Sequence, residues 1–352
     1  MGADGTPQQL GKYILYERLG RGGMAEVWKA LDTQLRRYVA IKILRADLRN
    51  DPQFSTRFLR EAQVVASLRH PNIVQVYDFQ VIRSPEAKEP LAYMVMDYIA
   101  GQNLADYIAA TSWRGNYPSP QDIVYLFRII GQAIDYAHRK GIIHRDIKPA
   151  NILLDQSAVT SHSMGEPVLT DFGLVKLMSS PTMSLKGLWL GTPLYTSPEQ
   201  AQGFTVDEYS DIYSLGVILY EICTGRRPFS GNTATAILRQ HISAAPPPPE
   251  QINPAIPQAL TEVILRCLAK DPEARFPSAS SLAAALAQAV KTTTLVPSAS
   301  PFSADETSNR IQADPHLSHA VLPPVAREAL LASPASPSPD LQAASQFASP
   351  ID

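Results

Sequence analysis

Short apolar runs separated by polar turns fill residues 13–97 of the chain. Five runs have strand length and are rich in β-branched and aromatic residues: YILYERL, EVWKALD, YVAIKIL, IVQVYDF and LAYMVMDY. Between residues 51 and 68 the apolar positions recur instead at helical spacing, with Phe54, Phe58 and Val65 among them. The pattern predicts a small sheet accompanied by one main helix.

From about Asn103 the apolar positions take on the longer period of α-helices. Residues 122–141, DIVYLFRIIGQAIDYAHRKG, end at Gly141, a residue type that favours the C-terminal cap of a helix. Residues 209–225, YSDIYSLGVILYEICTG, are apolar nearly all round, which is typical of a helix buried at the centre of a lobe. The pattern therefore predicts an α+β protein in which a larger, mainly helical region follows the small sheet.

The changes of pattern divide the chain into three parts. Residues 1–12 form an N-terminal extension, residues 13–290 a folded domain with lobes at 13–97 and 98–290, and residues 291–352 a tail. The tail is rich in proline and serine and poor in aromatic residues, so it cannot bury enough apolar area to offset its chain entropy. We predict that the tail is disordered, with AVLPPVAREALLA as its helix-prone or docking segment.

Charge and composition narrow the classes of partner and compartment. The chain carries 31 Lys and Arg against 33 Asp and Glu, a net charge of −2, so no global field favours nucleic acid. No apolar run approaches the ~18 residues of a membrane span, and the N-terminus lacks the build of a signal peptide. Cys223 and Cys267 lie in apolar helical patterns typical of core thiols. We expect a cytoplasmic protein without a membrane span or nucleic-acid partner, whose oligomeric state the pattern leaves open.

The Gly-rich segment 19-LGRGGMAEVWKA-30 fits two functions. Gly20-x-Gly22-x-x-Ala25 matches a dinucleotide-binding turn, which must lead straight into a helix. Glu26-Val-Trp-Lys-Ala-Leu-Asp is instead rich in β-favouring residues and runs into a second strand, so the segment forms a hairpin. A Gly-rich flap over a nucleotide predicts a lysine on the next strand, and Lys42 stands there. We therefore favour the flap.

Transfer of a γ-phosphoryl group requires charge to be neutralised and the reactants to be held in line, with little covalent chemistry from the protein. Lys42 can bind the α- and β-phosphates if a carboxylate holds it in place. Glu61, in RFLREAQ, lies on the inward face of the predicted helix and can supply that carboxylate. The pair predicts a nucleotide site beside the flap.

A second polar cluster lies in 142-IIHRDIKPANILL-154, on a loop between an amphipathic helix and a strand. Asp146 can orient a hydroxyl and accept its proton, Lys148 can steady the γ-phosphate, and the amide oxygen of Asn151 can bind Mg²⁺. Asp171 follows in LTDFG, at a strand end from which it can ligate Mg²⁺ as well. We interpret His144 as structural, because the motif gives the role of base to the aspartate.

Nine segments resemble, in order, those of Ser/Thr protein kinases, and most closely the eukaryotic-like (Hanks-type) kinases of bacteria: GRGGMAEV, VAIK, FLREA, HPNIVQVYDF, HRDIKPANILL, DFGLVK, GTPLYTSPEQAQG, SDIYSLGVILYEICTGRRPF and CLAKDPEARF. They cover about residues 13–290, with insertions at 84–90 and 156–167 that we expect to be surface loops. The resemblance implies a bilobal protein-kinase-like fold, with a small β-rich lobe and a larger helical lobe. It also implies ATP- and Mg²⁺-dependent phosphorylation of Ser and Thr in proteins, autophosphorylation and a role in signalling.

The resemblance assigns roles to single positions. The nucleotide would be held by the flap, the hinge and apolar side chains around the adenine: Leu19, Gly20, Gly22, Gly23, Val27, Ala40, Lys42, Glu61, Asp97, Ile99 and Leu153. After the gatekeeper-like Met96, Asp97 would offer its carbonyl and Ile99 its N–H to the adenine edge. The catalytic residues would be Lys42, Asp146, Lys148 and Asn151, and the metal ligands Asn151 and Asp171.

Further positions would hold the fold or set the specificity. Glu199 in SPE and Arg275 in DPEARF would form a buried ion pair that anchors the activation segment. Asp211, in SDIYSLG, is a further structural position. Lys148 in the form HRDxKxxN, together with Thr192 in GTPLY, matches the pattern of Ser/Thr kinases rather than that of tyrosine kinases.

The activation segment, residues 171–199, carries the candidate regulatory sites. Arg145 precedes the catalytic aspartate, a combination that typically needs a negative charge on this segment. Ser184 stands at the family's usual distance before the Gly-Thr step and Thr182 just beyond it, so we favour autophosphorylation at one of them. In the alternative, the apolar run at residues 188–190 orders the segment by packing, without a phosphate.

Three classes of protein fit parts of this pattern: an active kinase, a pseudokinase scaffold that binds partners without catalysis, and a dinucleotide-dependent oxidoreductase. A scaffold would be expected to have lost at least one of the polar site residues, yet all are present: Lys42, Glu61, Asp146, Asn151 and Asp171. The oxidoreductase is excluded by the hairpin. The sequence therefore predicts a kinase that acts on protein substrates, whose identity and upstream signal it does not give.

Overall fold

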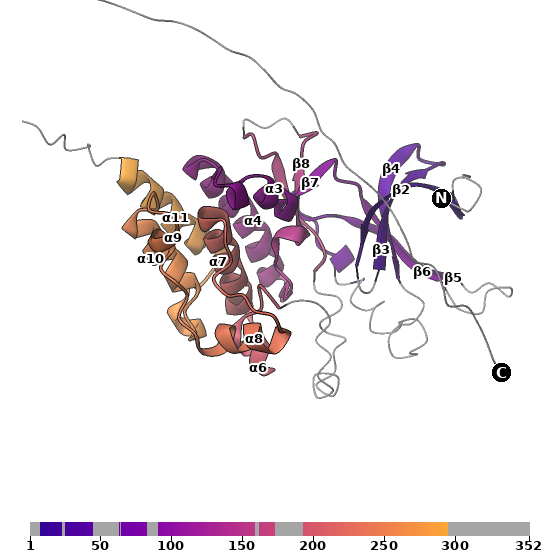
Figure 1. Ribbon diagram of the computed structural model, residues 1–352. Helices are drawn as coiled ribbons and strands as arrows, with labels where there is room; N and C mark the ends of the chain where they lie inside the picture. The colour runs from indigo at the N-terminus through magenta and orange to yellow at the C-terminus, as the bar shows by residue number, and fades with distance from the viewer. Residues whose placement is uncertain are drawn as a thin grey trace, which may run out of the picture. The chain divides into compact units, whose positions relative to one another are not determined.

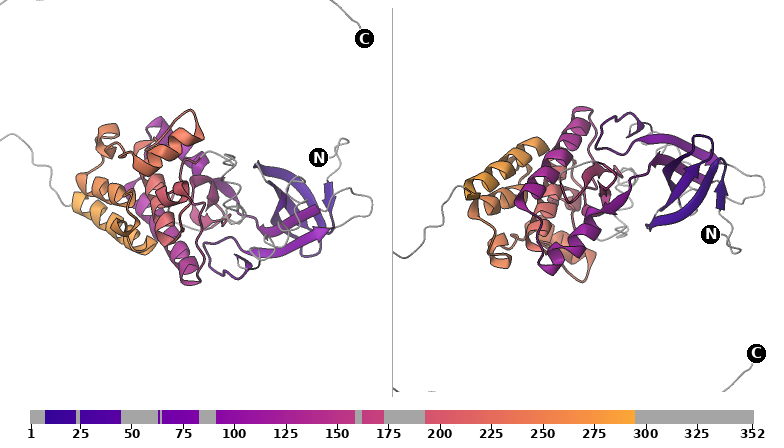
Figure 2. Two further views of the ribbon diagram at one scale, coloured as in Figure 1. Left: turned by 90° about the horizontal axis from the view of Figure 1, so that it is seen from below. Right: turned by 90° about the horizontal axis from the view of Figure 1, so that it is seen from above.

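A computed structural model describes residues 8–22, 25–44, 63, 65–82, 91–158, 162–172 and 193–294 of the chain. Within these residues the larger sheet and the long helices form two separate groups, as the views in Figures 1 and 2 show. The sheet comes first along the chain and the helices follow, as the change from strand to helix periodicity predicts.

The smaller lobe is built on a six-stranded antiparallel sheet in the order β1-β2-β3-β4-β6-β5. Its strands are β1 (Gln8–Leu10), β2 (Tyr13–Arg21), β3 (Ala25–Asp32), β4 (Arg37–Leu44), β5 (Val76–Ile82) and β6 (Leu91–Asp97). Leu15, Ala30, Ile41 and Val95 are buried together on one face of this sheet. Because neighbouring residues of a strand point to opposite faces, Ala40 and Met96 lie on the other face, where the candidate site is built.

The larger lobe is mainly helical and carries a small sheet in the order β7-β8-β9. Its strands are β7 (Gly101–Asn103), β8 (Ile152–Asp155) and β9 (Glu166–Leu169). Its α-helices are α3 (Leu104–Ala110), α4 (Pro120–Arg139), α6 (Pro198–Gln202), α7 (Glu208–Thr224), α8 (Ala234–Ser243), α9 (Pro249–Ile252), α10 (Gln258–Cys267) and α11 (Ala279–Thr294). Among the residues described here, short 3-10 helices lie at η1 (Ser112–Arg114), η2 (Pro149–Asn151) and η4 (Pro272–Ala274).

Local chemistry fixes both ends of α4, the helix that leads into the loop at residues 142–151. The side chain of Ser119 accepts a hydrogen bond from the backbone N–H of Asp122, and Pro120 occupies the first turn, where its missing N–H costs nothing. After the helix, Gly141 takes a φ of 73°, in the left-handed region that the C-terminal cap requires. The predicted cap is therefore confirmed, and the chain turns there into the loop.

α7 is the central helix of the larger lobe, and every residue from Ser210 to Thr224 is buried. Its neighbour α10 approaches closely at Gly216, where a Cβ would lie 2.4 Å from the Cβ of Cys267. Both cysteines are free and buried, and burial raises the pKa of Cys223 to about 12. The expectation of packed core thiols is confirmed, and α7 provides a rigid base for the loops above it.

The structure differs from the sequence expectations at several boundaries. β1 pairs with β2 inside the expected N-terminal extension, and α11 runs past residue 290 to Thr294. The expected surface loop at 156–167 overlaps β9, because Glu166 and Pro167 pair with β8. Most of the predicted helix at 51–68 and the insertion at 84–90 lie outside the described residues, as does the tail beyond Thr294.

Candidate active site

The loop between α4 and β8 brings together the polar residues that the sequence predicts as catalytic. The Nζ of Lys148 donates to Oδ2 of Asp146 at 2.7 Å. The amide nitrogen of Asn151 donates to the same oxygen at 3.2 Å and to the backbone carbonyl of Asp146 at 2.8 Å. A single carboxylate is therefore held by an ammonium group and an amide, which fixes its orientation.

A buried carboxylate on α7 holds the backbone of this loop. Asp211 is 1 % exposed, and its oxygens accept the backbone N–H groups of His144 and Arg145, each at 2.9 Å. The Nε2 of His138 lies 2.8 Å from Oδ2 of Asp211. Arg145 adopts a φ of 66°, which a non-glycine residue takes only at a cost, so Asp211 stabilises an unfavourable backbone conformation beside Asp146. The predicted structural position at Asp211 thus supports the catalytic loop.

His144 lies under the loop in a structural position. The side chain is buried, its Nε2 is 3.1 Å from the carbonyl oxygen of Thr170, and its ring packs 4.5 Å from that of Phe172. Burial lowers the pKa of His144 below its ordinary value, since the charged form is poorly solvated there. The side chain therefore ties the catalytic loop to the segment that carries Asp171.

Lys42 and Asp171 join the two lobes. The Nζ of Lys42, on β4, donates to Oδ1 of Asp171 at 2.7 Å, and the backbone N–H of Thr170 donates to the carbonyl of Asn151 at 3.0 Å. Asp171 has a φ of 57°, a second strained backbone position in the site. The structure thus brings Lys42, Asp171 and Asn151 into one neighbourhood, whereas the predicted partner Glu61 lies outside the described residues.

Apolar residues predicted to surround a nucleotide gather between the lobes. Ala40 and Met96 are buried with Val74 and Val168, and three of the predicted residues pack against them: Val27, Ile99 and Leu153. Leu19 lies outside this cluster and is 44 % exposed. Gly20 pairs with Val27 near the end of the β2–β3 hairpin, and the N–H of Gly22 donates to the carbonyl of Ala25 in the turn, while Gly23 lies outside the described residues.

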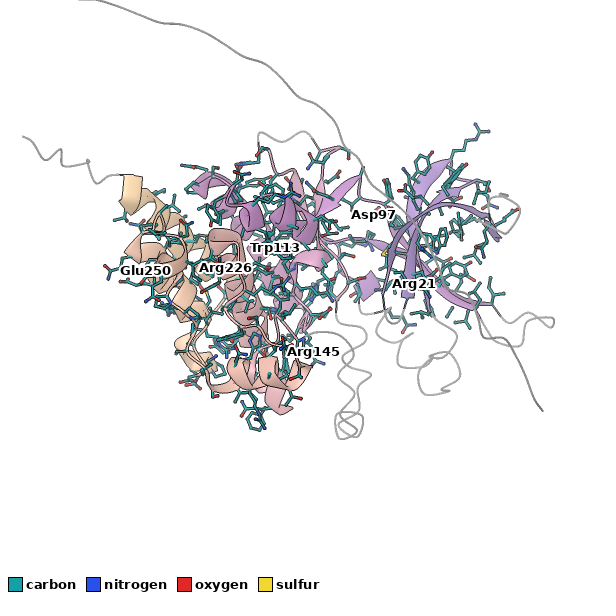
Figure 3. All side chains as sticks on the ribbon, viewed as in Figure 1. Arg21, Asp97, Trp113, Arg145, Arg226 and Glu250 are labelled. Carbon is teal, nitrogen blue, oxygen red and sulfur yellow. The ribbon has the colours of Figure 1, made fainter. Side chains whose placement is uncertain are left out.

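The hinge residue Asp97 ends β6, where the strands of the smaller lobe give way to the helices (Figure 3). Its carboxylate accepts the backbone N–H of Gln75 at 3.2 Å and the hydroxyl of Tyr77. The side chain is therefore directed towards β5 and the residue before it, while the side chain of Ile99 packs against the apolar cluster of Ala40 and Met96.

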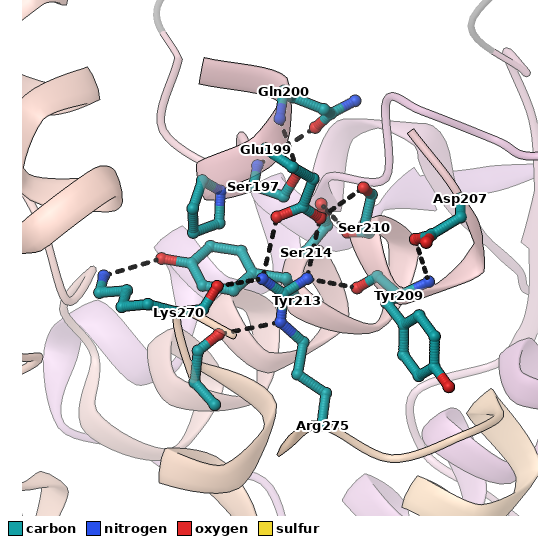
Figure 4. A network of polar contacts seen from close by, with 12 residues as sticks. Ser197, Glu199, Gln200, Asp207, Tyr209, Ser210, Tyr213, Ser214, Lys270 and Arg275 are labelled. Atoms are coloured by element: carbon teal, nitrogen blue, oxygen red, sulfur yellow. Dashed lines mark hydrogen bonds and ion pairs between the residues drawn. The ribbon is translucent and has the colours of Figure 1, made fainter. Parts of the chain in front are cut away.

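The predicted pair of Glu199 and Arg275 is present and buried (Figure 4). Nη1 and Nη2 of Arg275 donate to the two oxygens of Glu199 at 2.8 and 2.9 Å. The guanidinium also donates to backbone carbonyls, including those of Tyr209 and Ala269. Burial alone would raise the pKa of Glu199, but hydrogen bonds from Arg275 and Ser210 hold it below its ordinary value. The pair joins α6 to the residue that follows η4.

The regulatory positions are only partly described. Arg145 is in place next to Asp146, and the side chain of Gln200 on α6 donates to the carbonyl of Arg145 at 2.9 Å. Thr182, Ser184 and Thr192 lie outside the described residues. Their predicted roles in autophosphorylation therefore stay predictions.

Sequence reasoning missed several residues that support the site. His138 stands one helical turn after the buried Ile134, so its position on the inward face of α4 was a usable signal. Gln200 gave no signal, because its contact depends on how α6 packs on the catalytic loop. Tyr195, Glu221 and Trp113 form a further cluster at the end of α7, which spacing along the chain does not reveal.

Comparison with known proteins agrees with this geometry. The family model described as "Protein kinase domain" matches residues 13–287. The chain belongs to the protein kinase family. It is 44 % identical over 275 residues to a probable serine/threonine-protein kinase PknB of Bifidobacterium longum. The matched region covers 77 % of this chain and 38 % of the relative. It is 42 % identical over 275 residues to the serine/threonine-protein kinase PrkC of Bacillus subtilis, covering 78 % and 40 %.

The solved structures agree on the fold. The PknI kinase domain of Mycobacterium tuberculosis superimposes with a TM-score of 0.61 at 25 % identity, covering 81 % of this chain and 98 % of that domain. The predicted bilobal α+β fold and the resemblance to bacterial Hanks-type kinases are confirmed. The chain spans about two fifths of the length of the curated relatives it matches. Within the part that the structure describes, no helix combines the length and hydropathy needed to cross a membrane.

Proposed function

We propose that the protein transfers the γ-phosphoryl group of ATP to Ser and Thr hydroxyls of proteins, including its own. The observation that carries the proposal is the carboxylate of Asp146, fixed by Lys148 and Asn151 on a loop whose backbone is held by Asp211. The names of the PknB and PrkC relatives support Ser and Thr as the acceptors. The polar residues of the described site are all present, so nothing here favours the scaffold alternative.

Asp146 acts on the acceptor. Its carboxylate accepts the proton of the incoming hydroxyl, and so orients the hydroxyl oxygen towards the phosphorus atom. The ammonium group of Lys148 lies 2.7 Å from the carboxylate of Asp146, where it can also stabilise the charge that spreads over the transferred group. The apolar cluster around Ala40 and Met96 offers an uncharged surface on which the adenine can pack.

The donor set fits a hard divalent cation bound with the phosphates. Asn151 commits its amide nitrogen to Asp146, which leaves the amide oxygen as its ligand atom, and Asp171 supplies a carboxylate that is about one third exposed. Two oxygen ligands from the protein, completed by phosphate and water, suit Mg²⁺. Bound there, the cation would neutralise phosphate charge, while Lys42 would exchange its contact with Asp171 for contacts with the phosphates.

Protein substrates follow from the proposed reaction, and the near-neutral net charge of −2 supports the absence of a nucleic-acid partner. A cytoplasmic location is part of the same proposal. It is supported by the two buried free thiols, which suit a reducing compartment.

The decisive experiment uses the purified full chain with labelled ATP, Mg²⁺ and a generic Ser/Thr peptide. Asp146→Asn is expected to lower kcat by roughly 10²- to 10⁴-fold with little change in ATP affinity, because the carboxylate acts on the acceptor. Asp106→Asn, at an exposed position on α3, serves as the matched control and should keep the wild-type rate. An equal loss of rate and of ATP affinity in Asp146→Asn would refute the role of Asp146.

Autophosphorylation of Ser184 or Thr182 belongs to the same proposal. A double variant, Thr182→Ala with Ser184→Ala, should lose its activation-segment phosphopeptide and much of its rate, because Arg145 then lacks an anionic partner there. Wild-type activity without any loop phosphopeptide would instead favour ordering of the segment by the apolar residues 188–190.

A further inference from the structure

An aromatic and basic surface lies where η1 meets the end of α7. Trp113 is 51 % exposed and Tyr117 39 %, and Arg114 and Arg226 are exposed beside them. A Cβ on Gly225 would lie 3.5 Å from the Cα of Trp113, so the backbone just before Arg226 lies against η1, and both residues are labelled in Figure 3. We call these four residues the Trp113 surface.

The buried carboxylate of Glu221 beside this surface is neutralised by neighbouring side chains. Glu221 is 1 % exposed, and its oxygens accept hydrogen bonds from Nε1 of Trp113 at 3.2 Å and from the hydroxyl of Tyr195. Nε of Arg227 forms an ion pair with Glu221 at 3.0 Å. Arg227 also packs its guanidinium 5.2 Å from the ring centre of Trp113. Because Glu221 is buried and already paired with these partners, it does not balance the charges of Arg114 and Arg226.

The guanidinium groups of Arg114 and Arg226 are available to an external partner. Within the ranges that the structure describes, neither Arg114 nor Arg226 forms an ion pair. An unpaired guanidinium beside an exposed indole is a common way to bind carboxylate or phosphate groups, because the arginine supplies paired donors and the ring supplies apolar area. The Trp113 surface therefore has the chemistry of an acceptor for anionic polypeptide.

The surface is also connected to the catalytic loop through a short series of contacts. Tyr195, which bonds Glu221, is held by the Oγ of Ser214 through its carbonyl at 2.7 Å. It stands five residues before Gln200, whose side chain bonds the carbonyl of Arg145 next to the catalytic Asp146. Contacts through Glu221 and Tyr195 therefore link the Trp113 surface to the segment that runs on to Gln200 and the loop of Asp146.

We propose that the Trp113 surface binds an acidic segment flanking the phosphoacceptor residue of a protein substrate. The proposal rests on the proposed kinase function and specifies its substrate class. Two exposed ion pairs, to Arg114 and Arg226, together account for a preference of roughly threefold to tenfold. Trp113 adds affinity without regard to charge.

The test separates binding from catalysis. Labelled peptides with a single Thr acceptor, flanked on one side by Glu, Gln or Lys residues and otherwise identical, are titrated with the full chain, and their anisotropy is measured without ATP. The Glu peptide should bind roughly threefold to tenfold more tightly than the Gln peptide, and the Lys peptide more weakly than both. The preference should fall as salt is added. A variant with Arg114→Glu and Arg226→Glu should reverse the order.

Controls distinguish the possible outcomes. Arg139→Glu, at the exposed end of α4, makes a matched charge reversal and should keep the wild-type preference, and Trp113→Phe should weaken all three peptides alike. Equal binding of the Glu and Gln peptides, or an unchanged preference in the double variant, would overturn the proposal. So would self-association of the full chain that Trp113→Phe abolishes, since a second copy would then cover the surface. Charge-dependent binding without phosphoryl transfer would refute the kinase function alone, and transfer without charge dependence would refute the surface alone.

Discussion

At the scale of single residues, the site depends on carboxylates that never touch a substrate. Asp211 holds two backbone N–H groups of the catalytic loop and so sustains the left-handed backbone of Arg145. Charged acceptors of this kind bind N–H groups more strongly than neutral ones do. The geometry of Asp146 is therefore set from α7, beneath the loop.

Replacing Asp211 by Asn tests this dependence. The variant keeps one acceptor oxygen but turns an amide N–H₂ towards a backbone donor. We therefore expect the free energy of unfolding to fall by about 1.5–3 kcal/mol. The kcat for peptide phosphorylation should fall while ATP binding is retained, because the loop that carries Asp146 relaxes. Urea denaturation and steady-state kinetics measure the two effects. Unchanged kcat in a folded Asp211→Asn protein would contradict the positioning role.

The contribution of the buried pair of Glu199 and Arg275 can be tested by comparing the stability of a single variant with that of a double variant. Arg275→Ala leaves a buried carboxylate that, among the described side chains, keeps Ser210 as its donor, so stability should fall by about 3–5 kcal/mol. The double variant Glu199→Gln with Arg275→Met removes both charges and should lose less than the single variant. Thermal denaturation compares them. A double variant less stable than Arg275→Ala would show that the pair itself, rather than the isolated charge, dominates.

Much of the polar chemistry at this scale was predictable from spacing along the chain. Asp146, Lys148 and Asn151 lie within one loop, so their proximity follows from the sequence. The contact of Lys42 with Asp171 joins residues far apart in sequence, and the cluster of Trp113, Glu221 and Tyr195 joins three separate elements. Such contacts follow from tertiary packing, for which a single sequence carries no local signal.

At the scale of elements, apolar periodicity predicted the long strands and helices, because each buries one face or, for α7, its whole surface. β1 escaped prediction because three residues, of which one is a buried leucine, are too short to show a period. The end of α11 escaped for a different reason. Its last turn is a Lys followed by three Thr residues, which have modest helix propensity, yet the helix continues from a well-packed body.

α8 is held to α7 by a buried histidine, and this contact makes stability depend on pH. His241 is fully buried, with Nδ1 at 3.0 Å from the hydroxyl of Tyr213. Burial, together with the charge of Lys270, lowers the pKa of His241 to about 4. As pH falls below the unfolded value near 6.5, the unfolded chain takes up a proton that the native state refuses, so stability decreases.

The size of this effect can be measured against a variant that cannot titrate. Between pH 7 and pH 5 the wild type should lose about 2 kcal/mol more of its free energy of unfolding than His241→Gln does, since each pH unit below 6.5 costs about 1.4 kcal/mol. Urea denaturation at both pH values gives the two differences. Parallel losses in both proteins would mean that His241 is protonated in the native state.

At the scale of the whole molecule, the C-terminal boundary of the folded domain is set by α11. Its first N–H groups, those of Ala279 and Ser280, donate to the buried carboxylate of Asp135 on α4, each at 2.9 Å. Further along, Leu282 and Leu286 are fully buried. The helix is therefore part of the core of the larger lobe, although the match to the kinase family ends within it, at residue 287.

Two truncations test where the catalytic unit ends. A chain that stops after Thr294 keeps every buried residue of α11, so it should retain the unfolding free energy and the peptide phosphorylation rate of the full chain. A chain that stops after Ala285 removes Leu286, whose burial alone contributes about 1.5–3 kcal/mol, and leaves the packed half of α11 too short to hold its place on α4. It should unfold at distinctly lower urea concentration. Loss of activity on truncation at Thr294 would mean that the tail takes part in phosphoryl transfer. Full stability of the shorter chain would show that the second half of α11 does not contribute to the core.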